Sequence, residues 1–155
     1  MLTNMAFLWI VLISTNALAG STPYKGRGGQ IEAYGMIMGT YFAALAAIEI
    51  CGENPAYERE SEETARDYLN ANHALYIRLA QKIKELAVKN GGDKESLRLK
   101  SEIHDARASM EKQAKDEMRK QVVDKDSCTS ILANIRKGVM DLKTQRGNEI
   151  ARILE

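Results

Sequence analysis

The stretch GMIMGTYFAALAAI, from Gly35 to Ile48, contains no charged side chain. Such a stretch is either a span across a membrane or a helix that other helices bury. The uncharged residues 33–48 would rise about 24 Å as an α-helix, which is short of the roughly 30 Å of hydrocarbon in a bilayer. Three further segments each have one apolar face that needs a surface to cover, so the stretch is predicted to be a buried core helix.

Those three segments repeat apolar residues at helical spacing, and clusters of Gly, Pro, Asn and Asp separate them. Runs of alternating β-branched residues, which would indicate strands, are absent from the sequence. We expect helices near residues 30–51, 55–90, 94–123 and 128–154. The sequence therefore predicts an all-α fold, in which residues 30–155 form one up-down-up-down four-helix bundle.

The second predicted helix has the clearest apolar seam. Its members are Ala65, Leu69, Asn72, Tyr76, Leu79, Ile83 and Leu86. Asn72 is the polar exception. An inward asparagine commonly sets the register between helices by pairing with another polar group, at some cost in stability. If Asn72 serves register alone, Asn72→Leu should raise the thermal stability.

The two cysteines test the predicted topology. Cys51 ends the first predicted helix and Cys128 begins the fourth, and these two points lie at the same end of an up-down-up-down bundle. A disulfide between Cys51 and Cys128 is therefore expected, and a pair of free buried thiols is the alternative. Closing so long a loop would stabilise the fold by about 4 to 5 kcal/mol in the chain-entropy model.

The N-terminal residues 1–19 have the layout of a secretory signal peptide. An apolar run of eight residues, Ala6–Ile13, precedes a polar stretch and then Ala17-Leu18-Ala19, which predicts cleavage after Ala19. The absence of Lys and Arg before the apolar run departs from the usual pattern. An uncleaved anchor is the alternative, but eight apolar residues are too few to cross a bilayer. The glycine-rich residues 20–29 are expected to be a flexible lead-in.

Export and a disulfide both point to an oxidising compartment. The chain contains no Asn-x-Ser/Thr acceptor for N-glycosylation, which favours a bacterial protein over a eukaryotic secreted one. We therefore expect a periplasmic or secreted bacterial protein with no membrane association once the signal peptide has been removed.

Composition and motifs argue against several classes of function. The 22 basic and 21 acidic residues nearly balance, so there is no excess of positive charge for nucleic acid. His73 and His104 lie on different predicted helices, and neither follows a Glu by three residues as in helical-bundle metal sites. Motifs for nucleophilic catalysis, covalent haem and phosphate-binding loops are also absent. The sequence therefore predicts neither a cofactor nor an enzyme.

One side of the first predicted helix is uncharged although it faces away from the seam. It contains Ala33, Met36, Ile37, Thr40, Ala44 and Ala47. A contiguous apolar patch on a monomeric bundle is typical of a partner site or a self-association site. The candidate interaction face is accordingly Met36, Ile37, Thr40 and Ala44. The alternative is that long side chains of neighbouring helices, or the lead-in, cover it.

Taken together, these patterns predict an exported helical protein that acts by protein–protein binding rather than by catalysis. The partner would be an unknown protein or a second copy of the chain. One alternative is an immunity or inhibitor protein that blocks an exported toxin or hydrolase. Another is a membrane-associated helper that uses residues 33–48 as its span.

Overall fold

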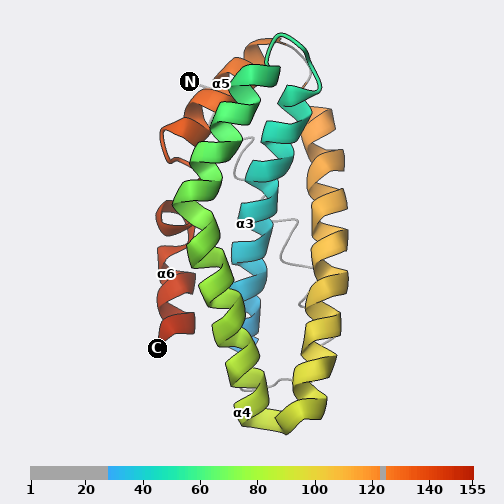
Figure 1. Ribbon diagram of the computed structural model, residues 1–155, viewed down its shortest axis with the longest axis vertical. Helices are drawn as coiled ribbons and strands as arrows, with labels where there is room; N and C mark the ends of the chain where they lie inside the picture. Colours follow the sequence, from blue (N-terminus) through green and yellow to red (C-terminus); the bar gives the residue numbers. More distant parts are fainter. Residues whose placement is uncertain (1–27, 123–124) are drawn as a thin grey trace.

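The computed structural model describes residues 28–122 and 125–155, and within these ranges all regular secondary structure is helical. The elements are α3 (Gly28–Gly52), α4 (Glu58–Gln121), α5 (Lys125–Arg136) and α6 (Leu142–Leu154) (Figure 1). α4 is interrupted at Gly92, so the described residues form five helical segments. The predicted all-α class is confirmed. The predicted signal peptide and nearly all of the predicted lead-in lie outside the described residues.

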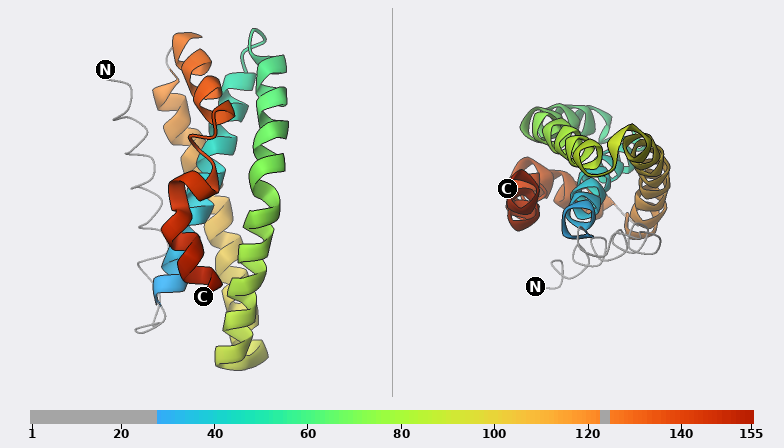
Figure 2. Two further views of the ribbon diagram at one scale, coloured as in Figure 1. Left: turned by 90° about the vertical axis from the view of Figure 1, so that its left-hand side faces the viewer. Right: turned by 90° about the horizontal axis from the view of Figure 1, so that it is seen from below.

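α3 runs through the middle of the molecule, flanked by α4 and by the α5–α6 segment (Figures 1 and 2). Between Ala33 and Ile48 every residue is buried except Met36 and Leu45, which are half-buried. α3 is about 37 Å long at 1.5 Å per residue, so it is long and apolar enough to cross a membrane. Length alone therefore does not distinguish a membrane span from a core helix. In this structure, other helices of the same chain bury most of the apolar helix.

α4 is a helical hairpin that reverses at Gly92, where the backbone has φ of +70°. This left-handed conformation is open to glycine and strained for other residues. Residues 58–91 form the N-terminal arm and residues 93–121 the C-terminal arm, and both lie alongside α3 (Figure 1). The two arms correspond to the helices predicted at 55–90 and 94–123.

The prediction of one continuous helix over residues 128–154 is wrong, because the chain breaks between α5 and α6. The Gly138 amide donates to the Ile135 carbonyl oxygen over 2.9 Å, and the Val139 amide donates to Asn134 over 3.1 Å. With φ of +73° at Gly138, these bonds form a Schellman stop, which ends α5. The apolar spacing continues across the break, so periodicity alone did not reveal it.

Aromatic rings fill the contact between α3 and the N-terminal arm of α4. The Tyr41 and Tyr76 rings stack in parallel with their centroids 4.3 Å apart, and the Tyr34 ring also stacks on Tyr76, at 6.1 Å. The Tyr41 hydroxyl bonds His73 Nδ1 over 2.7 Å. Burial raises the pKa of Tyr34, Tyr41 and Tyr68, so these phenols stay neutral across the physiological range.

The disulfide between Cys51 and Cys128 is confirmed, with a Cα–Cα distance of 5.5 Å. Both residues are buried, and the bond joins the last turn of α3 to the first turn of α5. It therefore closes a loop that contains the whole of the α4 hairpin.

Replacing both cysteines, Cys51→Ala with Cys128→Ala, should lower the free energy of unfolding by about 3 to 5 kcal/mol. The reason is that a cross-link between residues 77 positions apart removes much of the entropy of the unfolded chain. Urea unfolding followed by circular dichroism measures the change. Dithiothreitol should produce a similar loss in the unmodified protein and none in the double variant. A loss below about 1 kcal/mol would contradict this account.

Candidate functional site

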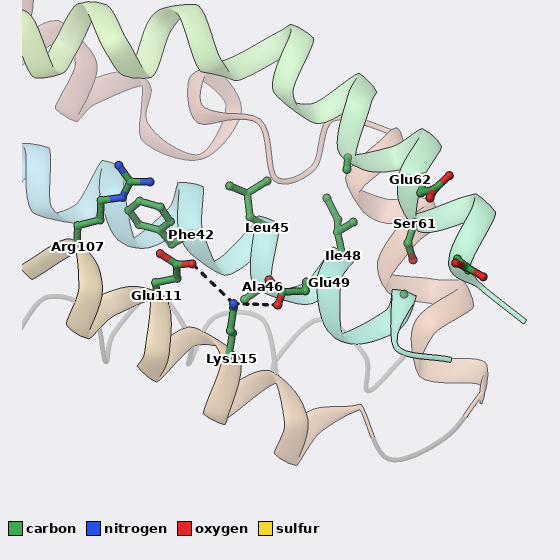
Figure 3. Close-up of a pocket in the computed structure, with 13 residues that line it drawn as sticks. Phe42, Leu45, Ala46, Ile48, Glu49, Ser61, Glu62, Arg107, Glu111 and Lys115 are labelled. Carbon is green, nitrogen blue, oxygen red and sulfur yellow. Dashed lines mark ion pairs between the residues drawn. The ribbon is translucent and has the colours of Figure 1, made fainter. Parts of the chain in front are cut away.

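A groove of about 480 Å³ lies between α3 and the two arms of α4 (Figure 3), and we refer to it as the α3–α4 groove. Its volume is within the range of about 300 to 1,000 Å³ that is usual for ligand pockets. The floor comes from α3 and consists of Phe42, Leu45, Ala46, Ile48, Glu49 and Gly52. The walls come from the arms of α4 and consist of Glu58, Ser61, Glu62, Ala65, Arg107, Glu111 and Lys115.

Helical spacing brings these side chains together. The floor positions 42, 45, 46 and 49 and the wall positions 58, 61, 62 and 65 both follow the i, i+3, i+4, i+7 pattern of one helix face. Positions 107, 111 and 115 are one turn apart on the C-terminal arm. Small residues at Ala46 and Ala65 leave space between the helices. At Gly52 the helices approach so closely that an added Cβ would lie 3.2 Å from Ser61 Cβ, which closes this end of the groove.

Lys115 links α3 to the C-terminal arm of α4 at one edge of the groove (Figure 3). Its Nζ lies 2.8 Å from Glu49 Oε1 on α3 and 3.7 Å from Glu111 Oε1 on its own arm. The hydrogen bond to Glu49 is the main reason why the pKa of Lys115 is raised. Lys115 therefore stays protonated at neutral pH, and its single positive charge lies between two carboxylates.

Opposite charges stand at the two ends of the groove. The Arg107 guanidinium carbon lies 5.4 Å from the centre of the Phe42 ring, at one end of the apolar floor. Glu62 stands at the other end, beside Ser61, with Glu58 one turn earlier on the same arm (Figure 3). Within residues 28–122 and 125–155, none of Arg107, Glu58 and Glu62 forms an ion pair. These three charged side chains can therefore form ion pairs with a molecule that binds in the groove.

Ser61 is the unusual polar residue of this site. Its side chain is 4% exposed, and its hydroxyl has no hydrogen-bond partner in the part of the chain that the structure describes. A buried hydroxyl without a partner costs roughly 1 to 3 kcal/mol, so native structures rarely keep one without a reason. Its hydroxyl oxygen is buried at the closed end of the groove, beside Gly52.

The candidate interaction face predicted on α3 is not open to solvent. Ile37, Thr40 and Ala44 are buried and Met36 is half-buried. α6 packs against α3, and Arg146 of α6 donates from Nε to Thr40 Oγ1 over 2.8 Å. α6 therefore packs on this side of α3, and one of its long side chains reaches Thr40, in line with the alternative that neighbouring helices cover the face. Burial lowers the pKa of Arg146, whose guanidinium also lies 3.7 Å from the Glu149 carboxylate.

Asn72 is 2% exposed and makes three hydrogen bonds. Its Nδ2 donates to the Tyr68 carbonyl oxygen and to Asp141 Oδ1, both over 3.0 Å. Its Oδ1 accepts the Leu142 amide over 2.8 Å. Leu142 is the first residue of α6, whose amide lacks an intrahelical acceptor, and the Asp141 side chain does not cap the helix. Asn72 therefore supplies the cap for α6 from a different helix.

Thr40 and Asn72 thus serve the same purpose, which is to hold α6 against α3 and α4. The structure brings these two sequence-predicted residues together around α6 and away from the α3–α4 groove. Sequence reasoning did not identify Ser61, Glu62 or Arg107, because each has an ordinary helical context and only the fold places them around one groove. No cluster of three or more His, Cys, Asp or Glu side chains suited to a metal occurs in the described ranges.

Replacing the α6 cap, Asn72→Leu, should lower the free energy of unfolding by about 2 to 3 kcal/mol. The buried Leu142 amide would lose its acceptor and the Asp141 carboxylate would lose a donor. The matched control is Asn70→Leu, an exposed position on the same arm, which should change stability by less than about 0.5 kcal/mol. Urea unfolding measures both. If Asn72→Leu instead raised the stability, the capping role would be contradicted, and Asn72 would serve only to set the register between helices.

The contact between Thr40 and Arg146 should be measurable in a double-mutant cycle. Thr40→Val leaves the buried Arg146 Nε without its acceptor, so we expect a loss of about 1 to 3 kcal/mol. In an Arg146→Met background the same change should cost clearly less, because no donor is left unpaired. Additive effects in thermal or urea unfolding would show that this hydrogen bond contributes nothing.

The α3–α4 groove therefore offers apolar contact along its floor and opposite charges at its ends, which is chemistry for binding. No protein-family model, no curated protein and no solved structure matches the chain.

Proposed function

We propose that this chain is an exported protein that binds another protein through the α3–α4 groove and carries out no catalysis. The observation that supports this most directly is the groove itself, which combines an apolar floor with unpaired charges at both ends. Binding sites need an apolar surface to contribute affinity and a few placed polar groups to contribute specificity.

The proposal includes the compartment and the topology. Residues 1–19 would direct export, and the disulfide suits the oxidising periplasm or extracellular space. The proposed topology is an up-down-up-down four-helix bundle. Its helices would be α3, the two arms of α4, and the α5–α6 segment, which is interrupted at Gly138. An immunity or inhibitor protein directed at an exported toxin or hydrolase is one form that such binding could take.

A membrane-associated helper that uses residues 33–48 as its span is less well supported. α3 would have to leave the helices that bury it before lipid could surround it. That change would break the hydrogen bond between Arg146 and Thr40 and the ion pair between Lys115 and Glu49. It would also leave the apolar faces of α4, α5 and α6 in water, at a large cost in hydrophobic free energy.

Site-specific photocrosslinking in cells tests the proposed function. A benzophenone amino acid at Glu62, on the groove rim, should give a discrete crosslinked adduct with a partner protein. The matched control places it at Arg78, which is exposed on the opposite face of the same arm and should give no such adduct. The proposal fails if position 62 gives no adduct, or if both positions give the same pattern.

A further inference from the structure

We propose that the occupant of the α3–α4 groove is an amphipathic α-helix of the partner protein. This helix places a basic side chain beside Glu58 and Glu62 and an acidic side chain beside Arg107. The inference rests on the proposed function and specifies the chemistry of the partner.

The shape of the groove favours a helix over a small molecule. Its floor runs from Phe42 to Gly52, which is about 15 Å or three turns of helix. Glu49 on its floor and Glu58, Glu62 and Arg107 on its walls are all exposed, so the groove is open along its length. A small-molecule site instead encloses most of its ligand. An open apolar channel between helices is the geometry in which amphipathic helices dock.

The charges of the groove specify the ends of the occupant. Its lining carries four carboxylates, on Glu49, Glu58, Glu62 and Glu111, against the two cations Arg107 and Lys115, for a net formal charge of −2. Lys115 forms ion pairs with both Glu49 and Glu111, and these three groups together keep a formal charge of −1. The groups that form no ion pair among the described residues are two carboxylates at one end and one guanidinium at the other. A partner of complementary charge is basic at the first end and acidic at the second.

The two unpaired carboxylates lie close together in the chain, on Glu58 and Glu62 of the same arm. A lysine ammonium carries three donors and an arginine guanidinium five, so either can pair with both carboxylates at once. One basic side chain at this end of the occupant would therefore neutralise both groups.

Synthetic peptides provide the probe. The first is an amphipathic helix of about 14 residues with a leucine face, lysines at one end and glutamates at the other. The second has the same leucine face with glutamine at every charged position. Fluorescence anisotropy with the full chain, at low and high salt, should show the charged peptide binding at least roughly tenfold tighter, with the difference shrinking as salt rises.

Variants of the groove residues test whether the charged peptide binds in the α3–α4 groove. Glu58→Gln with Glu62→Gln should weaken the charged peptide by roughly five- to tenfold, and Arg107→Gln by roughly two- to fivefold, since each exposed pair contributes modestly. Neither change should affect the neutral peptide. The matched control is Asp67→Asn with Glu85→Gln, two exposed acids on the far side of the same arm, which should leave both affinities unchanged. Melting curves of each variant verify that the fold is intact.

The inference is overturned if neither peptide binds, if both bind equally, or if the groove variants bind like the control variant. It is also overturned if the chain dimerises in sedimentation experiments and the Glu58/Glu62 variant alone dissociates the dimer, because the groove would then hold a second copy. These failures differ from failure of the proposed function. A crosslinked partner at position 62 combined with no peptide discrimination would keep the binding function and reject the charged helix.

Discussion

The structure depends on the burial of α3, a helix whose residues 33–48 carry no charge on any side. An ordinary surface helix needs one neighbour, whereas α3 needs several, and both arms of α4 together with α5 and α6 pack against it. Gly35, Gly39, Ala43 and Ala47 recur at every fourth position and are all buried, so neighbouring backbones can come close to it. The other helices each have one apolar face, and that face is turned toward α3. Hydrophobic burial is the main force in this arrangement, but it has little directional preference.

A small number of specific contacts fix how the other helices are oriented against α3. The disulfide fixes α5 at one end, Asn72 fixes the beginning of α6, and the hydrogen bond from Arg146 to Thr40 fixes its middle. Lys115 and Arg119 of the C-terminal arm form ion pairs with Glu49 of α3 and with Glu53, the residue that follows α3. Each contact joins elements that are distant in sequence. Such contacts select one arrangement among the many that would bury the same apolar area.

The helical class, the two arms of α4 and the disulfide could be predicted because periodicity, breakers and the positions of Cys51 and Cys128 are local or topological signals. The break at Gly138 could not, because the apolar spacing runs through it and a single glycine is tolerated within many helices. The contact at Thr40 could not be predicted either, because it comes from an arginine more than 100 residues later in the chain. The α3–α4 groove is a tertiary feature: Ser61 and Arg107 look like ordinary helical residues until the fold places them on one cavity.

The disulfide lies at the end of the molecule where the α3–α4 groove closes. Cys51 immediately precedes Gly52, which closes the groove, while the reversal at Gly92 lies at the opposite end of the molecule (Figure 1). The covalent link therefore restrains the end of the molecule where the groove closes, and only noncovalent contacts hold the hairpin tip. A surface held rigid before encounter loses less conformational entropy when a ligand binds. Under the proposed export and groove binding, forming the disulfide would therefore raise the affinity of the groove, and a reduced chain would bind its partner more weakly than an oxidised one.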